Sequence, residues 1–401
     1  MKSNSPWITA VEAAALLRVS RATLYAYVSR GLVRSQSTPG PARQRGYSRE
    51  DVERLRRRTE ERRDPDRATA RALQWGLPVL ESSITLIAAD TLYYRGHDAL
   101  VLARSRSFRE VASLIWTGAF DHAFAAAAAR STVQERALLR DLPFAARAQV
   151  LLAIGAARDP QAGDLRAPHA AACGWRILRL MTAAATRSAS GTGDIDQRLA
   201  RAWRVPARGV DILRTAMILC ADHELNVSSF AARCVASAES HPYAVVSAGL
   251  AALEGPRHGG ASARVDSMLG SLRRGGNLRQ AVSARLRRGE PVSGFGHPLY
   301  PTGDPRATML LELLRTRYPR SVDVAFLLDV AEAAGSVIRE KPNVDFALAA
   351  IVRVLRLPPE AGLALFAIGR TVGWIGHAIE QYATGQLIRP RAKYVGVVPA
   401  Q

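Results

Sequence analysis

Four segments place titratable side chains among glycines and prolines, at points where helical patterns begin or end. They are ADHELNVSSFAAR (221–233), GPRHGGA (255–261), GFGHPLYPTGDPR (294–306) and KPNVDFALAAI (341–351). Glycine lets a ligand approach the backbone closely, and proline interrupts a helix. An apolar core needs none of these features, so the four segments are the first candidates for a site that performs chemistry.

Two histidines and one aspartate stand out within these segments. His258 and His297 each lie in a glycine-containing turn, where a neutral imidazole can donate a hydrogen bond to a carbonyl that is becoming an enolate. Asp345 follows a helix N-cap, Asn343, and a carboxylate can take a proton from a carbon next to a carbonyl. Taken singly, each has an alternative: a loop histidine is commonly structural or exposed, and the helix dipole favours an acid in the first turn.

Three arginines are candidates for binding an anion. Arg306 follows Asp304-Pro305, and Arg389 precedes Pro390. Arg370 lies within an apolar helical pattern and shares a face with Trp374 and His377. In a chain this rich in arginine most guanidinium groups are solvated, but a charge on an apolar helix requires an acid or an anionic ligand.

The elements that must position these residues are predicted to be helices. The chain has 401 residues, 48% of them hydrophobic and only 6% aromatic, and several segments repeat apolar residues with helical spacing. The length predicts two or three domains. No apolar run reaches the length of a membrane span and the N-terminus lacks a signal peptide, so we expect a cytoplasmic protein without a membrane partner.

The order and spacing of the motifs resemble the citrate synthase family. The series is Y-R-G near residue 95, then D-H-E-L-N, G-P-x-H-G-G, G-F-G-H with D-P-R after it, N-V-D-F, R-T-V-G-W and I-R-P. The resemblance extends over essentially all of the chain beyond residue 75. It implies a mainly α fold, with all-helical large and small domains in a catalytic region at 76–401 and the small-domain insertion at roughly 255–360.

The resemblance also implies an activity. Members of this family condense acetyl-CoA with oxaloacetate to give citrate and CoA, through an enol or enolate and hydrolysis of citryl-CoA. Asp345 would be the base that deprotonates the acyl-CoA methyl group. His258 would stabilise the enolate, and His297 would polarise the ketone.

Four further residues match positions that bind the substrate in this family. His223, Arg306 and Arg370 would hold oxaloacetate, and Arg389 would reach into the site of the neighbouring subunit of a homodimer. No permanently bound cofactor is implied, because the acyl-CoA is a co-substrate. The sequence also shows no cluster of metal ligands.

Several departures from the family pattern leave the acyl chain open. Pro298 stands where the family usually has a basic residue, and Ser262 and Ala263 replace the usual Asn-Glu. An enzyme that uses propionyl-CoA, a 2-methylcitrate synthase, is therefore an alternative. One methyl group contributes only about 1–3 kcal/mol to discrimination.

The N-terminal segment, residues 1–60, resembles a MerR-like winged helix-turn-helix domain. A capping box at Thr9 to Glu12 opens one helix, and Ser20 caps a second that stops at Gly31. A Pro/Gly/Arg-rich stretch at 35–47 has the length of a β-hairpin wing. Residues 61–75 are predicted to be a charged linker.

This N-terminal domain is expected to contact double-stranded DNA. The second helix would enter the major groove, while the wing would meet phosphates. Residues 1–67 hold 15 basic and 8 acidic residues, within a chain of formal charge +20. The candidate DNA-binding residues are Arg21, Thr23, Tyr25, Tyr27, Arg43 and Arg45. For this domain, the alternative is a helical appendage that serves dimerisation or solubility. For the whole chain, the alternative to an enzyme is a DNA-binding regulator whose synthase-like part senses a metabolite.

Overall fold

The structure, a computed structural model, describes residues 7–37, 45–53, 55, 80–121, 132, 137, 139–188, 193–274, 276–392 and 394–397. The chain divides into two compact units, residues 1–81 and 82–401. Each is described by itself below. The predicted charged linker, 61–75, lies outside the described residues.

The first unit is a small helix-turn-helix with an antiparallel sheet. Its elements are β1 (Trp7–Ile8), α1 (Ala10–Leu17), α2 (Arg21–Ser29), β2 (Ser35–Ser37) and β3 (Arg45–Ser48), with sheet order β1-β3-β2. The predicted capping box is present, because the Thr9 hydroxyl accepts from Glu12 N and the Glu12 carboxylate accepts from Thr9 N. Ser20 likewise accepts from Thr23 N and caps α2.

Strands β2 and β3 form the predicted wing, with Ser35 opposite Tyr47 and Ser37 opposite Arg45. A tripartite contact fixes the start of the wing, since Arg34 donates to the Asp51 carboxylate through its backbone N and through Nε and Nη2. Asp51 belongs to a helical stretch at 49–53. The wing and the third helix therefore share one hydrophobic core, to which Leu24 and Tyr47 belong.

The candidate DNA-binding residues differ in exposure. Arg21, Tyr25 and Arg45 are exposed, and Thr23 is half-buried with its hydroxyl 2.9 Å from that of Ser20. Tyr27 is half-buried and packs against the core of the unit, so it offers less surface to a ligand than Arg21, Tyr25 and Arg45 do. Arg43 lies outside the described residues.

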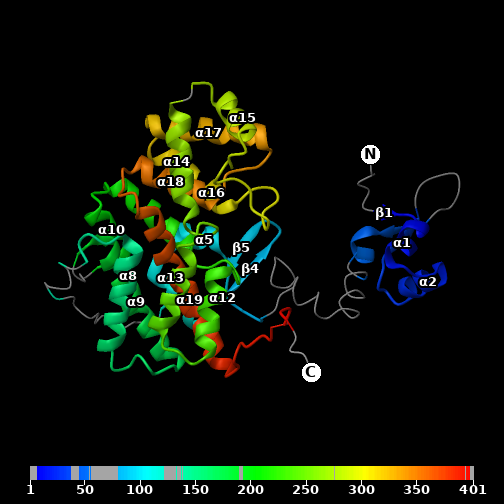
Figure 1. Cartoon of the computed structure of the whole chain (residues 1–401), viewed down its shortest axis with the longest axis horizontal. Coiled ribbons are helices and arrows are strands. Elements are labelled where there is room, and N and C mark those ends of the chain that lie inside the picture. Colours follow the sequence, from blue (N-terminus) through cyan, green and yellow to red (C-terminus); the bar gives the residue numbers. More distant parts are fainter. Residues whose placement is uncertain are drawn as a thin grey trace. The chain divides into compact units, whose positions relative to one another are not determined.

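The second unit is a helical body with one small sheet (Figure 1). Its strands β4 (Thr85–Ala88), β5 (Thr91–Tyr94) and β6 (His97–Asp98) form an antiparallel sheet. Its helices are α5 (Ala99–Ser105), α6 (Phe108–Thr117), α8 (Phe144–Arg158), α9 (Ala167–Thr186), α10 (Ile195–Ala202), η1 (Ala207–Gly209), α11 (Val210–Leu219), α12 (Val227–Ser237), α13 (Pro242–Leu253), α14 (Ala261–Arg273), α15 (Leu278–Arg287), α16 (Pro305–Arg317), α17 (Val322–Ile338), α18 (Val344–Val354) and α19 (Ala361–Thr384).

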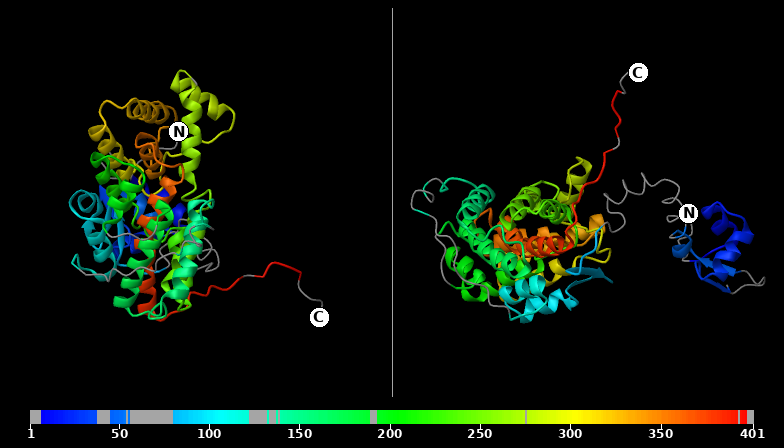
Figure 2. Two further views of the ribbon diagram at one scale, coloured as in Figure 1. Left: turned by 90° about the vertical axis from the view of Figure 1, so that its left-hand side faces the viewer. Right: turned by 90° about the horizontal axis from the view of Figure 1, so that it is seen from below.

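Helix α19 runs through the middle of this body, in contact with α9, α11, α12 and α13 (Figure 2). Within the described part of the chain it is the one helix long and apolar enough to cross a membrane, but 89% of that stretch is buried inside the structure. It is the central core helix. The predicted inward face is present, because Arg370, Trp374, His377 and Gln381 are all buried.

Two glycines of α19 allow another segment to approach it closely. A Cβ atom on Gly369 would lie 2.4 Å from Met217 O, and one on Gly373 would lie 2.4 Å from Ala221 O and from Asp222 Oδ1. Gly373 N also donates to Ala221 O at 2.9 Å. The end of α11 and the loop that carries His223 are therefore held directly against the helix that carries Arg370.

Candidate active site

The loop before α16 and the loop before α18 are joined by backbone hydrogen bonds. Gly296 N donates to Lys341 O at 2.9 Å, and Asn343 N donates to Gly294 O at the same distance. The Asn343 side chain donates to Gly296 O at 3.0 Å, while its oxygen caps α18. These bonds hold His297 and Asp345 in adjoining loops although 48 positions separate them in the numbering.

Asp345 lies in the first turn of α18, as predicted. Its Oδ1 is enclosed and has no hydrogen-bond partner in the structure. Burial raises the pKa of this carboxyl to about 7; Arg306 opposes the increase and Asp304 adds to it. A carboxyl group with a pKa near neutrality can gain and lose a proton under physiological conditions, as a general base must.

His297 is held as one neutral tautomer. Its Nδ1 accepts from Leu299 N at 3.2 Å, which leaves the ring proton on Nε2. Burial lowers the pKa of His297 to about 4, and Arg306 lowers it further. The ring is therefore a neutral hydrogen-bond donor through Nε2.

His223 and Tyr300 complete an aromatic cluster around His297. The ring centroids of His223 and His297 are 4.9 Å apart, and those of His297 and Tyr300 are 5.0 Å apart. His223 Nε2 lies 3.0 Å from the Tyr300 hydroxyl. Burial, followed by the charges of Arg306 and Arg370, holds the pKa of His223 well below its ordinary value, so this ring is neutral too.

Arg306 is buried and gripped by Asp304. Its Nε and Nη2 donate to the two carboxylate oxygens at 2.9 and 2.8 Å. Asp304 Oδ2 also accepts from Val344 N at 3.0 Å, at the start of α18. Although burial opposes it, the Arg306 charge keeps the pKa of Asp304 below its ordinary value. One carboxylate thus fixes the guanidinium of Arg306 and the first turn of α18, where Asp345 lies.

Arg370 is buried as deeply, but its charge is not paired in the same way. Only 1% of the residue is exposed, and Nε donates to Cys220 O at 2.9 Å. Its Nη1 is enclosed without a hydrogen-bond partner in the structure. Burial lowers the pKa of this guanidinium, while Asp222 raises it. Such an arrangement favours the arrival of an anion.

His258 lies between α13 and α14 and contacts the start of α12. Its Nε2 is 2.8 Å from Ser228 Oγ and 3.2 Å from Asn226 Oδ1. The Ser228 hydroxyl also accepts from Trp374 Nε1 on α19 at 3.2 Å. Burial, with a contribution from Arg370, lowers the pKa of His258 to about 3. His258 is therefore neutral, and its ring is anchored to the same helix that carries Arg370.

The structure thus brings six of the seven predicted residues into one set of adjoining elements. Arg389 is the exception: it is exposed in the segment that follows α19. Figure 1 shows this C-terminal segment leaving the helical body. Its predicted role requires a second subunit.

Three functional neighbours were not predicted as site residues. Ser228 lies in segment 221–233, two residues after the D-H-E-L-N motif, and Asp304 lies in the D-P-R motif, but a serine or an acid there gives no signal of its own. Tyr300 lies in segment 294–306, and nothing in the sequence distinguishes it as a site residue. Hydrogen bonds between segments distant in sequence reveal these residues, and spacing alone does not.

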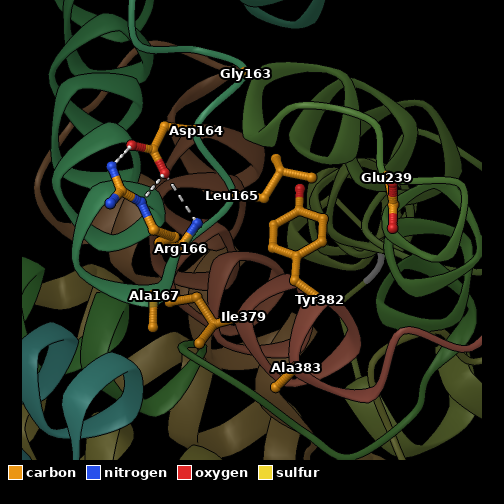
Figure 3. Close-up of a pocket in the computed structure, with 9 residues that line it drawn as sticks. All are labelled: Gly163, Asp164, Leu165, Arg166, Ala167, Glu239, Ile379, Tyr382 and Ala383. Carbon is orange, nitrogen blue, oxygen red and sulfur yellow. Dashed lines mark hydrogen bonds and ion pairs between the residues drawn. The ribbon is translucent and has the colours of Figure 1, made fainter.

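A separate cavity of about 650 Å³ lies near the start of α9 and the end of α19. Figure 3 shows Asp164 paired with Arg166 at one side of it and Tyr382 at the other. None of the candidate residues lines this cavity. Within the described ranges, no group of three or more His, Cys, Asp or Glu side chains is arranged to hold a metal ion.

Comparisons with known proteins agree with the motifs. The family model described as "Citrate synthase, C-terminal domain" matches residues 72–391, and one described as "Helix-turn-helix domain" matches residues 7–59. A solved citrate synthase from Thermotoga maritima has a TM-score of 0.66 and 27% identity. That match covers 81% of this chain and 96% of the other.

Curated relatives carry two names. "Citrate synthase 2" of Bacillus subtilis is 31% identical over 80% of this chain and 94% of its own length. "2-methylcitrate synthase" of Shewanella oneidensis is 29% identical over 78% and 91%. A Mycobacterium tuberculosis protein, provisionally named citrate synthase 2, is 38% identical over 48% of this chain; the chain spans about half of that relative, 53%. The chain belongs to the citrate synthase family and carries an N-terminal helix-turn-helix domain.

Proposed function

We propose that this protein condenses acetyl-CoA with oxaloacetate to form citrate and CoA. The observation that carries the proposal is the buried Nη1 of Arg370, which has no hydrogen-bond partner among the described residues, in a site with neutral histidines and a carboxyl group with a raised pKa. A dicarboxylate supplies the missing anion, and Arg306 and His223 provide further hydrogen-bond donors for it. The neutral histidine rings then donate hydrogen bonds to the carbonyl oxygens of the two substrates, and the Asp345 carboxylate removes a proton from the acyl-CoA.

The first chemical step is enolisation. Asp345 takes a proton from the methyl carbon of the thioester, and the negative charge that develops on the thioester oxygen accepts a hydrogen bond from His258. Because Ser228 has one hydroxyl proton, it can donate either to Asn226 Oδ1 or to His258 Nε2. When Ser228 donates to Nε2, the ring proton of His258 lies on Nδ1 and is available to the substrate.

Carbon–carbon bond formation follows. The enolate carbon attacks the ketone carbon of oxaloacetate, and His297 Nε2–H donates to the ketone oxygen as it gains negative charge. The ketone oxygen takes up a proton and becomes the hydroxyl group of citryl-CoA, which balances the proton that Asp345 removed from the methyl carbon. Water then cleaves the thioester, which releases citrate and CoA.

The acyl chain is the open part of the proposal. A 2-methylcitrate synthase that uses propionyl-CoA is the alternative, and it would use the same residues. Steady-state assays with oxaloacetate and either acyl-CoA, following CoA release, separate the two. We expect a higher kcat/KM with acetyl-CoA; a higher value with propionyl-CoA selects the alternative, and no turnover with either rejects the enzyme.

Quaternary structure enters through Arg389. We propose a cytoplasmic homodimer in which Arg389 of each chain completes the site of the other. Replacing Arg389 with Gln should raise the KM for oxaloacetate. Mixing that variant with the Arg370→Gln variant should restore part of the activity, since one site of a mixed dimer retains both arginines. Absence of complementation despite demonstrated subunit exchange contradicts the shared site.

A second function is favoured by the first unit. We propose that it binds double-stranded DNA through α2 and the wing, because Arg21, Tyr25 and Arg45 are exposed there on a helix-turn-helix scaffold. The alternative for the whole chain is a DNA-binding regulator whose synthase-like part senses a metabolite. Oxaloacetate or an acyl-CoA would then change the affinity for DNA.

Fluorescence anisotropy with genomic fragments around the protein's own gene tests this function. Affinity should fall steeply with salt, and each lost phosphate contact should reduce the slope by about 0.9. We expect Arg45→Ala to weaken binding, whereas Arg320→Ala, an exposed arginine of the second unit, should not. If none of the fragments binds, the DNA-binding function is rejected, while the proposed condensation is not affected.

A further inference from the structure

Tyr300 is a buried polar side chain that no step of the proposed reaction uses. Only 2% of the residue is exposed, and its hydroxyl lies 3.0 Å from His223 Nε2, although 77 positions separate the two residues. Within the described part of the chain, no other side chain forms a hydrogen bond with the His223 ring. The orientation of this ring therefore depends on a hydroxyl group that comes from a different loop.

The loop that carries Tyr300 is itself fixed by hydrogen bonds. Tyr300 N donates to His297 O at 3.0 Å, and Gly303 N donates to Tyr300 O at the same distance. The Thr302 hydroxyl donates to Asp90 Oδ2 at 2.7 Å, in the turn between β4 and β5. The Tyr300 hydroxyl is therefore presented to His223 from a turn that is held on both sides.

The ring of Tyr300 contacts two further residues of the site. Its centroid is 5.0 Å from that of His297 and 5.4 Å from Arg306 Cζ, which is within the range of a cation–π interaction. A phenylalanine would keep both ring contacts and would lack only the hydroxyl. The Tyr300→Phe substitution therefore isolates the hydrogen bond to His223.

The Tyr300 hydroxyl can hold His223 without adding a negative charge to the site. Burial raises the pKa of this hydroxyl to about 12, although Arg306 opposes the increase, so the group is neutral near pH 7. A phenol can donate to an imidazole nitrogen or accept from an imidazole N–H. A carboxylate could also hold the ring, but it would pair with Arg306 and repel a dicarboxylate.

We propose that Tyr300 is a positioning residue for oxaloacetate, which acts by holding the His223 ring in the orientation that the dicarboxylate requires. This inference rests on the proposed function. A ring that is already fixed loses less conformational entropy when the ligand arrives, so the hydroxyl increases affinity without touching the substrate. Because His223 holds oxaloacetate both before and during the reaction, the contribution should appear in KM more than in kcat.

Oxaloacetate binding to the full-length protein tests this role, with calorimetry for Kd and assays of CoA release for KM and kcat. Tyr300→Phe should raise Kd and KM by about tenfold and lower kcat by less than about threefold. Thermal unfolding of each variant shows that folded proteins are compared.

Tyr318→Phe is the matched control for the loss of a buried hydroxyl. The Tyr318 hydroxyl is enclosed and has no hydrogen-bond partner in the described ranges, and its ring also lies beside an arginine, with Arg208 Cζ 4.5 Å from the centroid. Tyr318→Phe should therefore leave Kd, KM and kcat unchanged.

A double-mutant cycle separates an action through His223 from direct contact with the substrate. In a His223→Gln background, Tyr300→Phe should change Kd by less than about twofold, because the ring that the hydroxyl orients is gone. An equal effect in both backgrounds, or an unchanged Kd in Tyr300→Phe alone, overturns this role even if the wild type condenses its substrates. A wild type that binds no oxaloacetate overturns both this role and the proposed function, whereas one that binds it without condensation overturns only the proposed function.

Discussion

Replacing Asp345 with Asn should stabilise the protein while abolishing condensation. The carboxyl group has a pKa of about 7 in the folded protein, against an ordinary value of 3.8. A difference of about 3 units, at about 1.4 kcal/mol per unit, amounts to about 4 kcal/mol at neutral pH. Asn has nearly the same shape and cannot ionise, so it removes this cost together with the base.

The gain should depend on pH in a defined direction. Below pH 3.8 the carboxyl is protonated in both the folded and the unfolded chain, so wild type and variant should not differ through ionisation. Between pH 3.8 and about 7 the unfolded chain releases the proton first, and the wild type loses stability relative to the variant. Above about pH 7 the difference should be constant and largest.

Chemical denaturation of both proteins at pH 5 and pH 8 measures the difference in the free energy of unfolding. Asp329→Asn, at an exposed acid on α17, is the matched control and should show no comparable gain. Two outcomes would contradict a raised pKa for this carboxyl. One is an Asp345→Asn variant that is less stable than the wild type at pH 8. The other is a difference in the free energy of unfolding between the two proteins that is the same at pH 5 and pH 8. Residual condensation at the wild-type rate refutes its role as the base.

Three further predictions follow from the hydrogen bonds of the site. Arg370→Met should raise the KM for oxaloacetate by at least about 100-fold without lowering Tm, because it removes a buried donor that has no partner; a large loss of Tm would contradict this. Asp304→Asn should destabilise the protein by about 3–5 kcal/mol and raise the same KM, since Arg306 would be left as an uncompensated buried charge; denaturation and oxaloacetate titration measure the two effects. Ser228→Ala should lower kcat by about 10- to 100-fold with little change in the KM for oxaloacetate, because it removes a partner of His258 Nε2; an unchanged kcat would exclude this role.

The parts of the site that could be predicted from sequence are those whose structure depends on residues close together in the chain. Asn343 lies two residues before Asp345, so helix-capping rules make Asn343 the N-cap of α18 and place Asp345 in its first turn. The helix-turn-helix has similarly local signals in its capping residues and turns. The mainly helical fold followed from the spacing of apolar residues and from the family resemblance.

Other features depend on contacts between distant segments. The tautomer of His297 is set by Leu299 N, and the anchoring of His258 depends on a serine 30 positions away. The partial burial of Tyr27 has a related origin, because the core of the small unit packs against its side chain. Side-chain burial in a helix this short depends on the neighbouring elements more than on its own pattern.

Condensation itself is tested most directly by following carbon-13-labelled acetyl-CoA with the purified protein and oxaloacetate. Labelled citrate and one equivalent of CoA should form only when oxaloacetate is present, and the Asp345→Asn variant should form neither. The rate should fall about tenfold between the plateau and one pH unit below the pKa of Asp345. Failure of the wild type to form labelled citrate would contradict the proposed condensation, and equal formation by the Asp345 variant would contradict the role of Asp345 as its base.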